Sequence, residues 1–131
     1  MKSKIFSALL LTVAVGVALS FALSEQQTKP WPVPEKYQKM KNPVKYDKTA
    51  AATLWTKHCK SCHGKAGKGD GPKAAQLDTP SGDFTTQTFK KQSDGALFYK
   101  SWIGRDDMPN YEKKIPDEDD IWQLVHYMRE F

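Results

Sequence analysis

The pentapeptide Cys59-Lys60-Ser61-Cys62-His63 decides how the rest of the chain is interpreted. It contains the only two cysteines of the sequence, with two residues between them and a histidine directly after the second. A Cys-x-x-Cys-His run is typical of haem c attachment, in which each thiol adds to a haem vinyl group and the histidine ligates the iron. The sequence therefore predicts Cys59 and Cys62 as attachment points of one haem c, and His63 as its proximal ligand.

The same cysteine pair has other interpretations. A small disulfide is one, and half of a zinc site is another. A structural zinc site needs four ligands, but the chain has no further cysteine, and His58 and His126 do not form a second pair at a usual spacing. A thioredoxin-like motif requires a βαβ context, which the flanking sequence does not offer. The haem interpretation is preferred, because the chain also begins like an exported protein.

Residues 1–24 resemble an export segment. Lys2 and Lys4 precede an apolar run over residues 5–23, as in a secretory signal peptide. The run is also long enough for a membrane-spanning helix, so a cleaved signal and an uncleaved membrane tether both stay open. No cysteine lies in this region, which excludes a lipid-anchored lipoprotein. We expect an exported protein of the periplasm, either soluble or tethered to the membrane.

Length and charge narrow the function classes. A chain of 131 residues allows one small domain besides the export segment. The net charge is +5, of which Lys2 and Lys4 contribute two, so the remainder carries +3. A basic chain can indicate nucleic-acid binding. An exported protein rarely meets nucleic acid, however, and we expect no such partner.

Residues 25–44 form a proline-rich arm between the export segment and the domain predicted at 45–131. Prolines at positions 30, 32, 34 and 43 disfavour a continuous helix and favour extended, polyproline-like backbone. Such an arm is typical of a tether. Trp31, Val33, Tyr37 and Met40 are too apolar for a purely solvated spacer, so part of the arm is expected to pack on the domain.

Three amphipathic helices are predicted within the domain. The first begins near Asp47 or Thr49 and runs into the CKSCH motif, the second begins at Ser93 and stops at Gly104, and the third follows Pro116. We expect Trp122 and Tyr127 to flank the buried stripe of the third helix and His126 to face solvent. The stripe itself is expected to consist of Ile121, Leu124, Val125 and Met128.

The connections between these helices are predicted to be turns and loops. Residues 64–72 contain four glycines in nine positions, which favours tight turns. Residues 73–77 are expected to form a short helical turn. The polar stretch 78–91 is expected to be rich in turns, with Pro80, Gly82 and Phe84 pointing inward.

Met108 is the candidate for the sixth iron ligand. It lies 45 residues beyond His63 in the stretch GRDDMPNY, between Asp107 and Pro109 and outside any amphipathic stripe. Core packing therefore explains this methionine poorly. A thioether is a soft ligand suited to haem iron opposite histidine, and His/Met ligation raises the reduction potential.

Taken together, these motifs resemble the class I cytochrome c family. The resemblance rests on Trp55 four residues before the first cysteine, on CKSCHG at 59–64, on GKGDGP at 67–72 and on the Met-Pro pair at 108–109. It covers about residues 45–131. Family members usually carry glycine eight residues before the first cysteine, where the first and last helices cross. Here that position is Ala51, which is small enough for a close crossing.

The resemblance implies an all-α fold with three main helices around one covalently attached haem c. It implies that the Pro72 carbonyl accepts a hydrogen bond from His63, and that Met108 occupies the distal position. It also implies that the chain acts as a one-electron carrier in an exported respiratory chain. Such a carrier transforms no substrate and is not an enzyme. The expected partners are redox proteins, a respiratory complex or an oxidase, that dock at the exposed haem edge of a monomer.

Two other functions are compatible with the sequence. A haem enzyme or gas sensor would keep an open or displaceable sixth site, and carbon monoxide binding by the ferrous protein would identify it. A c-type subunit of a larger respiratory complex is the second alternative. An uncleaved N-terminus or co-purification with an oxidase would favour that alternative.

Overall fold

The structure is a computed structural model that describes residues 30–131. The export segment and the first part of the arm lie outside the described residues. Val33–Phe131 form one compact unit. Within the described part of the chain all regular elements are helices, and the one β-bridge joins Arg105 and Met108 in a turn. The all-α prediction is confirmed.

Three helices of ten or more residues form the frame: α3 (Lys48–His58), α6 (Asp94–Ile103) and α7 (Glu118–Arg129). Each begins at a side-chain cap, as such residues favour. The caps are Asp47, Ser93 and Asp117, which accept hydrogen bonds from backbone amides of the first turn. Acidic residues fill the first turn of α7, where the helix dipole favours them.

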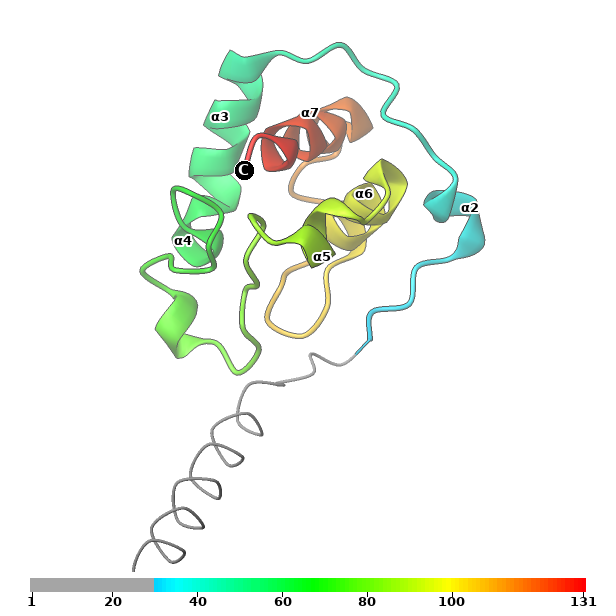
Figure 1. Cartoon of the computed structure of the whole chain (residues 1–131). Coiled ribbons are helices and arrows are strands. Elements are labelled where there is room, and N and C mark those ends of the chain that lie inside the picture. The colour runs from blue at the N-terminus through cyan, green and yellow to red at the C-terminus, as the bar shows by residue number, and fades with distance from the viewer. Residues whose placement is uncertain (1–29) are drawn as a thin grey trace, which may run out of the picture. The chain divides into compact units, whose positions relative to one another are not determined.

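The frame is arranged in the order α3, α7, α6, with the short helix α2 (Glu35–Gln38) outermost (Figure 1). Ala51 of α3 is fully buried, which agrees with the close crossing expected at that position. The core consists of apolar side chains from α3, α6 and α7 together with Phe84 and Ile115. Its largest fully buried members are Trp55, Trp122, Ile121 and Val125.

Residues 33–47, which we call the strap, lie on this frame. Tyr37, Met40 and Val44 pack against the core, as expected for the apolar part of the arm. Gly95 of α6 is needed here, because a Cβ atom at this position would lie only 1.9 Å from the Tyr37 carbonyl oxygen. As the prolines predict, no continuous helix forms here, but the extended backbone is interrupted by one helical turn at residues 35–38, between prolines 34 and 43.

Hydrogen bonds also join the strap to α7. The Asn42 side chain donates to the Trp122 carbonyl (2.9 Å), and Gln123 donates to the Lys45 carbonyl (2.8 Å). His126 Nε2 lies 2.9 Å from the Val44 carbonyl, so this histidine is half-buried. The expectation that His126 faces solvent is therefore wrong, because the strap covers that side of α7.

Three further predictions about side chains and elements need correction. Trp122 is fully buried in the core instead of flanking it, and its ring stacks on Phe98. Pro80 and Gly82 are exposed, and Phe84 is the buried residue of that segment. The stretch also contains a short helix, α5 (Gln87–Lys90), capped by Thr86.

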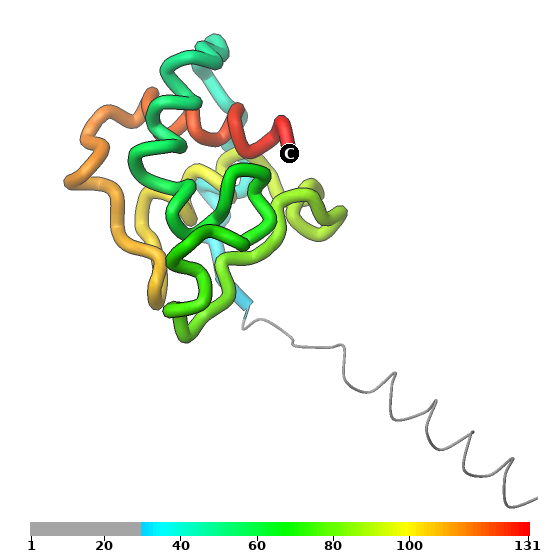
Figure 2. The backbone as a smooth tube through the Cα atoms, turned by 90° about the vertical axis from the view of Figure 1, so that its left-hand side faces the viewer, coloured from blue at the N-terminus to red at the C-terminus, as the bar shows by residue number. Residues whose placement is uncertain are grey.

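The remaining elements lie at one end of the frame. They are α4 (Lys60–His63), the 3-10 helix η1 (Ala74–Gln76) and the loop over residues 104–111 between α6 and the segment before α7. The segment after α4 and the 104–111 loop lie at the same end of the domain in both orientations (Figures 1 and 2). Within residues 30–131, the helices are too short or too polar to cross a bilayer.

Candidate functional site

The two cysteines lie where α3 passes into α4. Cys59 is the residue between the helices, and Cys62 lies inside α4, one residue before His63. Both thiols are free and half-buried, so the disulfide interpretation is not realised in this structure. Burial, and then the neighbouring Cys62, raise the pKa of the Cys59 thiol to about 12. A thiol that stays protonated at neutral pH is a poor redox nucleophile, which argues against a thioredoxin-like role.

The zinc interpretation also lacks support. No three His, Cys, Asp or Glu side chains of residues 30–131 come together in a way that could hold a metal ion. His58 belongs to a different cluster, since its ring makes an edge contact with Tyr111 at 5.8 Å. His58 is thus a partly buried residue at the end of α3.

His63, the last residue of α4, packs in an aromatic environment. Its ring centroid lies 4.7 Å from that of Phe84 and 5.9 Å from that of Trp55. Burial lowers the pKa of the His63 imidazole, an effect that the Ser81 backbone opposes. The ring is therefore neutral near pH 7, the form in which histidine ligates a metal.

His63 Nδ1 is buried and has no hydrogen-bond partner. A buried polar atom without a partner is costly in a folded protein. In a metal-bound histidine, the ring nitrogen that faces away from the metal is usually held by a hydrogen bond to an outer partner. In this structure Nδ1 lacks the outer partner that a ligating His63 would need. The neutral ring and the two free thiols that precede it fit covalent attachment of a haem whose iron His63 ligates.

The glycine-rich segment after His63 is packed directly on α4. Gly71 N donates to the Cys62 carbonyl (3.1 Å), and Lys73 N donates to the Ser61 carbonyl (2.8 Å). A Cβ atom on Gly71 would lie 2.4 Å from the Ser61 oxygen, so only glycine permits this approach. Pro72, between these two residues, is exposed and makes no hydrogen bond to His63 Nδ1 in this structure. Its predicted role as the partner of His63 stays a prediction.

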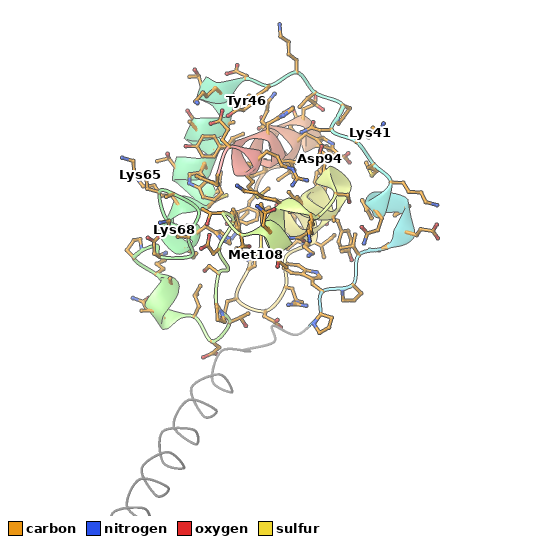
Figure 3. All side chains as sticks on the ribbon, in the orientation of Figure 1. Lys41, Tyr46, Lys65, Lys68, Asp94 and Met108 are labelled. Carbon is orange, nitrogen blue, oxygen red and sulfur yellow. The ribbon has the colours of Figure 1, made fainter. Side chains whose placement is uncertain are left out.

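Met108 lies in a tight turn at the same end of the domain (Figure 3). Arg105 and Met108 exchange two backbone hydrogen bonds of 2.9 Å, and Asp106 takes a positive φ of 52° between them. Met40 and Met128 pack on or in the core, whereas Met108 is a half-buried loop residue. Among the methionines that the structure describes, Met40 and Met128 are thus engaged in core packing, and Met108 is the better candidate for an iron ligand.

Sequence reasoning missed the residues that join the methionine loop to the cysteine segment. The Asp107 carboxylate accepts a hydrogen bond from Thr79 N (2.8 Å), and the Tyr111 hydroxyl donates to the His58 carbonyl (2.7 Å). It also missed the contact of Phe84 with His63. The only available signal was the position of Tyr111 shortly after the Met-Pro pair.

Comparison with known proteins agrees with these motifs. The family model described as Cytochrome c matches residues 48–131, which is from α3 to the end of the chain and more than half of its length. No curated protein matches the chain. The family implies covalently bound haem c, for which Cys59 and Cys62 are present, and a general role in electron transfer. The chain belongs to the cytochrome c family.

Proposed function

We propose that the chain is a monohaem c-type cytochrome that carries one electron at a time in an exported respiratory chain. One observation carries the proposal: His63 lies at the end of α4, directly after Cys62 and four residues after Cys59, and both thiols are free. Cys59 and Cys62 would hold the haem, and His63 and Met108 would ligate its iron. When bound, the haem supplies an iron that cycles between Fe(III) and Fe(II).

The side chains of this chain define what the site can do. The free thiols can form two thioether links. Trp55 and Phe84 pack against the His63 ring and limit its contact with solvent. Met108, as a neutral sulfur donor, would favour the reduced iron and raise its reduction potential. Ligation by both His63 and Met108 would leave no open position on the iron for a substrate, so we propose a carrier and not an enzyme.

We further propose that the redox partner, a respiratory complex or an oxidase, docks close to the attachment cysteines. Five lysines of that part of the chain are exposed, and one acidic side chain, Asp70, lies among them. An acidic partner would be steered toward such a surface by long-range attraction. The lysines of this surface are Lys57, Lys60, Lys65, Lys68 and Lys73. We expect the protein to act as an exported monomer in the periplasm.

The attachment experiment tests the proposal directly. The purified protein is extracted with acidified organic solvent, and haem is expected to stay on the chain because thioether bonds survive this treatment. Native mass spectrometry is expected to show one haem. The double variant Cys59→Ser/Cys62→Ser should lose it. Extractable haem in the wild type, or a stable holoprotein in the double variant, would overturn the proposal.

A second measurement separates the carrier from a haem enzyme or gas sensor. Carbon monoxide is added to the ferrous protein at neutral pH, and the Soret band is recorded. A carrier with a bound Met108 should show little binding. Ready binding would favour a displaceable sixth site and a different function.

A further inference from the structure

The loop over residues 104–111 is joined to the cysteine half of the domain on both sides of Met108. One residue before Met108, the Asp107 carboxylate accepts a hydrogen bond from Thr79 N at 2.8 Å. Three residues after it, the Tyr111 hydroxyl donates to the His58 carbonyl at 2.7 Å. In each case a side chain of the methionine loop bonds to the backbone of the other half.

The Tyr111 contact ends at a structurally fixed point. His58 is the last residue of α3 and directly precedes Cys59. Carbonyl groups at a helix end lack intrahelical partners, so the bond from Tyr111 satisfies one of them. The Tyr111 backbone is fixed as well, since its amide donates to the Trp102 carbonyl of α6 at 2.9 Å. Tyr111 therefore connects α6, the methionine loop and the attachment segment.

The Asp107 contact restrains the other end of the turn. The two backbone hydrogen bonds between Arg105 and Met108 make residues 105–108 one rigid unit. A bond from Asp107 to Thr79 N thus restrains Met108 as well. Thr79 belongs to the segment that follows the glycine-rich loop packed on α4. Both contacts limit how far the methionine can move from the segment that carries His63.

We propose that Asp107 and Tyr111 are positioning residues that hold Met108 in place as the sixth iron ligand. The inference rests on the proposed ligation by His63 and Met108. Neither residue ligates the iron. Their effect is to disfavour the open loop, in which an exogenous ligand replaces the methionine sulfur.

The test uses the haem-loaded protein and imidazole as the competing ligand. The ferric protein is titrated with imidazole, and the loss of the methionine-to-iron(III) charge-transfer band is followed. Tyr111→Phe removes one part-buried hydrogen bond and should raise the apparent imidazole affinity roughly tenfold, which corresponds to about 1.4 kcal/mol. Asp107→Ala removes a more exposed bond and should raise it roughly threefold.

Matched variants separate positioning from other effects. Tyr99→Phe removes a hydroxyl from a half-buried tyrosine whose ring packs on Tyr37, and it should leave the titration unchanged. Asp107→Asn keeps a carbonyl acceptor for Thr79 N and should restore most of the wild-type resistance to imidazole. Asp106→Asn removes the same charge from the same turn and serves as its control.

The outcomes distinguish this inference from the proposed ligation. If Met108→Ala leaves the ferric spectrum unchanged, the ligation itself is wrong. If Met108→Ala abolishes the band but Tyr111→Phe titrates like Tyr99→Phe, the ligation stands and the positioning role is overturned. The positioning role is supported if Tyr111→Phe and Tyr99→Phe lose the same free energy of unfolding but only Tyr111→Phe shows the tenfold higher apparent imidazole affinity.

Discussion

The cysteine side and the methionine side of the site are built in different ways. Residues 55–73 comprise the last turn of α3, the short helix α4 and a glycine-rich segment joined to α4 by backbone hydrogen bonds. Trp55, in this region, is only 2% exposed. Residues 104–111 form a loop held by one tight turn and by side chains that bond to distant backbone. The first region is anchored in the core by Trp55, and we expect the second to open without unfolding the core. Damage to the cysteine side should therefore reduce stability, and damage to the methionine side should change ligation.

The largest effect is expected from Trp55→Ala. The indole is buried against Tyr127 and Phe131, and its Nε1 donates to the Gly64 carbonyl at 3.2 Å. Removing a buried tryptophan leaves a cavity and costs about 3–5 kcal/mol. Denaturant unfolding of the holoprotein, followed by circular dichroism, measures this cost. Trp102→Ala, at a half-buried position, should cost clearly less, and equal losses would contradict the assignment of Trp55 to the core of the site.

Met108→Ala should have the largest effect on the iron. We expect the reduction potential to fall and the ferrous protein to bind carbon monoxide, because the sulfur ligand that favours Fe(II) is gone. The free energy of unfolding should change far less than in Trp55→Ala. Voltammetry and carbon monoxide titration check this. Met40→Ala and Met128→Ala are the controls, and a spectral change in either, with none in Met108→Ala, would transfer the ligand role to another methionine.

The same contrast explains how far sequence reasoning reached. The frame was predictable, because helix caps such as Asp47, Ser93 and Asp117 and the apolar stripe of α7 act locally. The cysteine motif was predictable because its chemistry requires a fixed spacing. Contacts between residues far apart in the sequence leave no comparable pattern in the sequence. The strap buries His126, and Tyr111 reaches His58 across 53 positions of sequence.

Arg129 illustrates the same limit within one helix. Its position in the last turn of α7 is favoured by the helix dipole. The sequence did not indicate that its guanidinium would bond to Asp94 (2.7 Å) and to the carbonyls of Lys90 and Gln92. These bonds join the end of α7 to the start of α6. A partner for a long cationic side chain depends on packing between helices, which periodicity alone does not give.

A moderate effect is expected from charge reversal near the cysteines. Lys60→Glu/Lys65→Glu should slow electron transfer to the true partner several-fold at low salt, and added salt should reduce the difference by screening. Lys41 lies on the other side of the domain from Lys65 and Lys68 (Figure 3). Lys36 belongs to α2 on that same side, so the reversal Lys36→Glu/Lys41→Glu serves as the control. Equal slowing by both pairs, or rates indifferent to salt, would favour apolar docking instead.

The smallest effect concerns alkaline pH. Burial, with smaller contributions from Cys59 and Cys62, raises the pKa of Tyr111 from its ordinary value of 10.0 to about 12. Below pH 10 the phenol is protonated whether the loop is closed or open. Between about pH 10 and 12 only an opened loop would release the proton, so opening should become easier as pH rises. The apparent imidazole affinity of the wild type should therefore rise with pH across this range, and it should rise less in Tyr111→Phe. An equal pH dependence in both proteins would contradict the role of this phenol.

The strap has a mechanical consequence. Its bonds run from Asn42, Val44 and Lys45 to α7, and its helical turn is seated on Gly95 of α6. A pulling force applied at residue 33 therefore reaches the domain through α6 and α7. The segment that carries His63 lies at the far end of α3, after these attachments along the chain. A pull on the N-terminal end of the described domain is therefore borne by the contacts of the strap with α6 and α7 before it reaches the surroundings of His63.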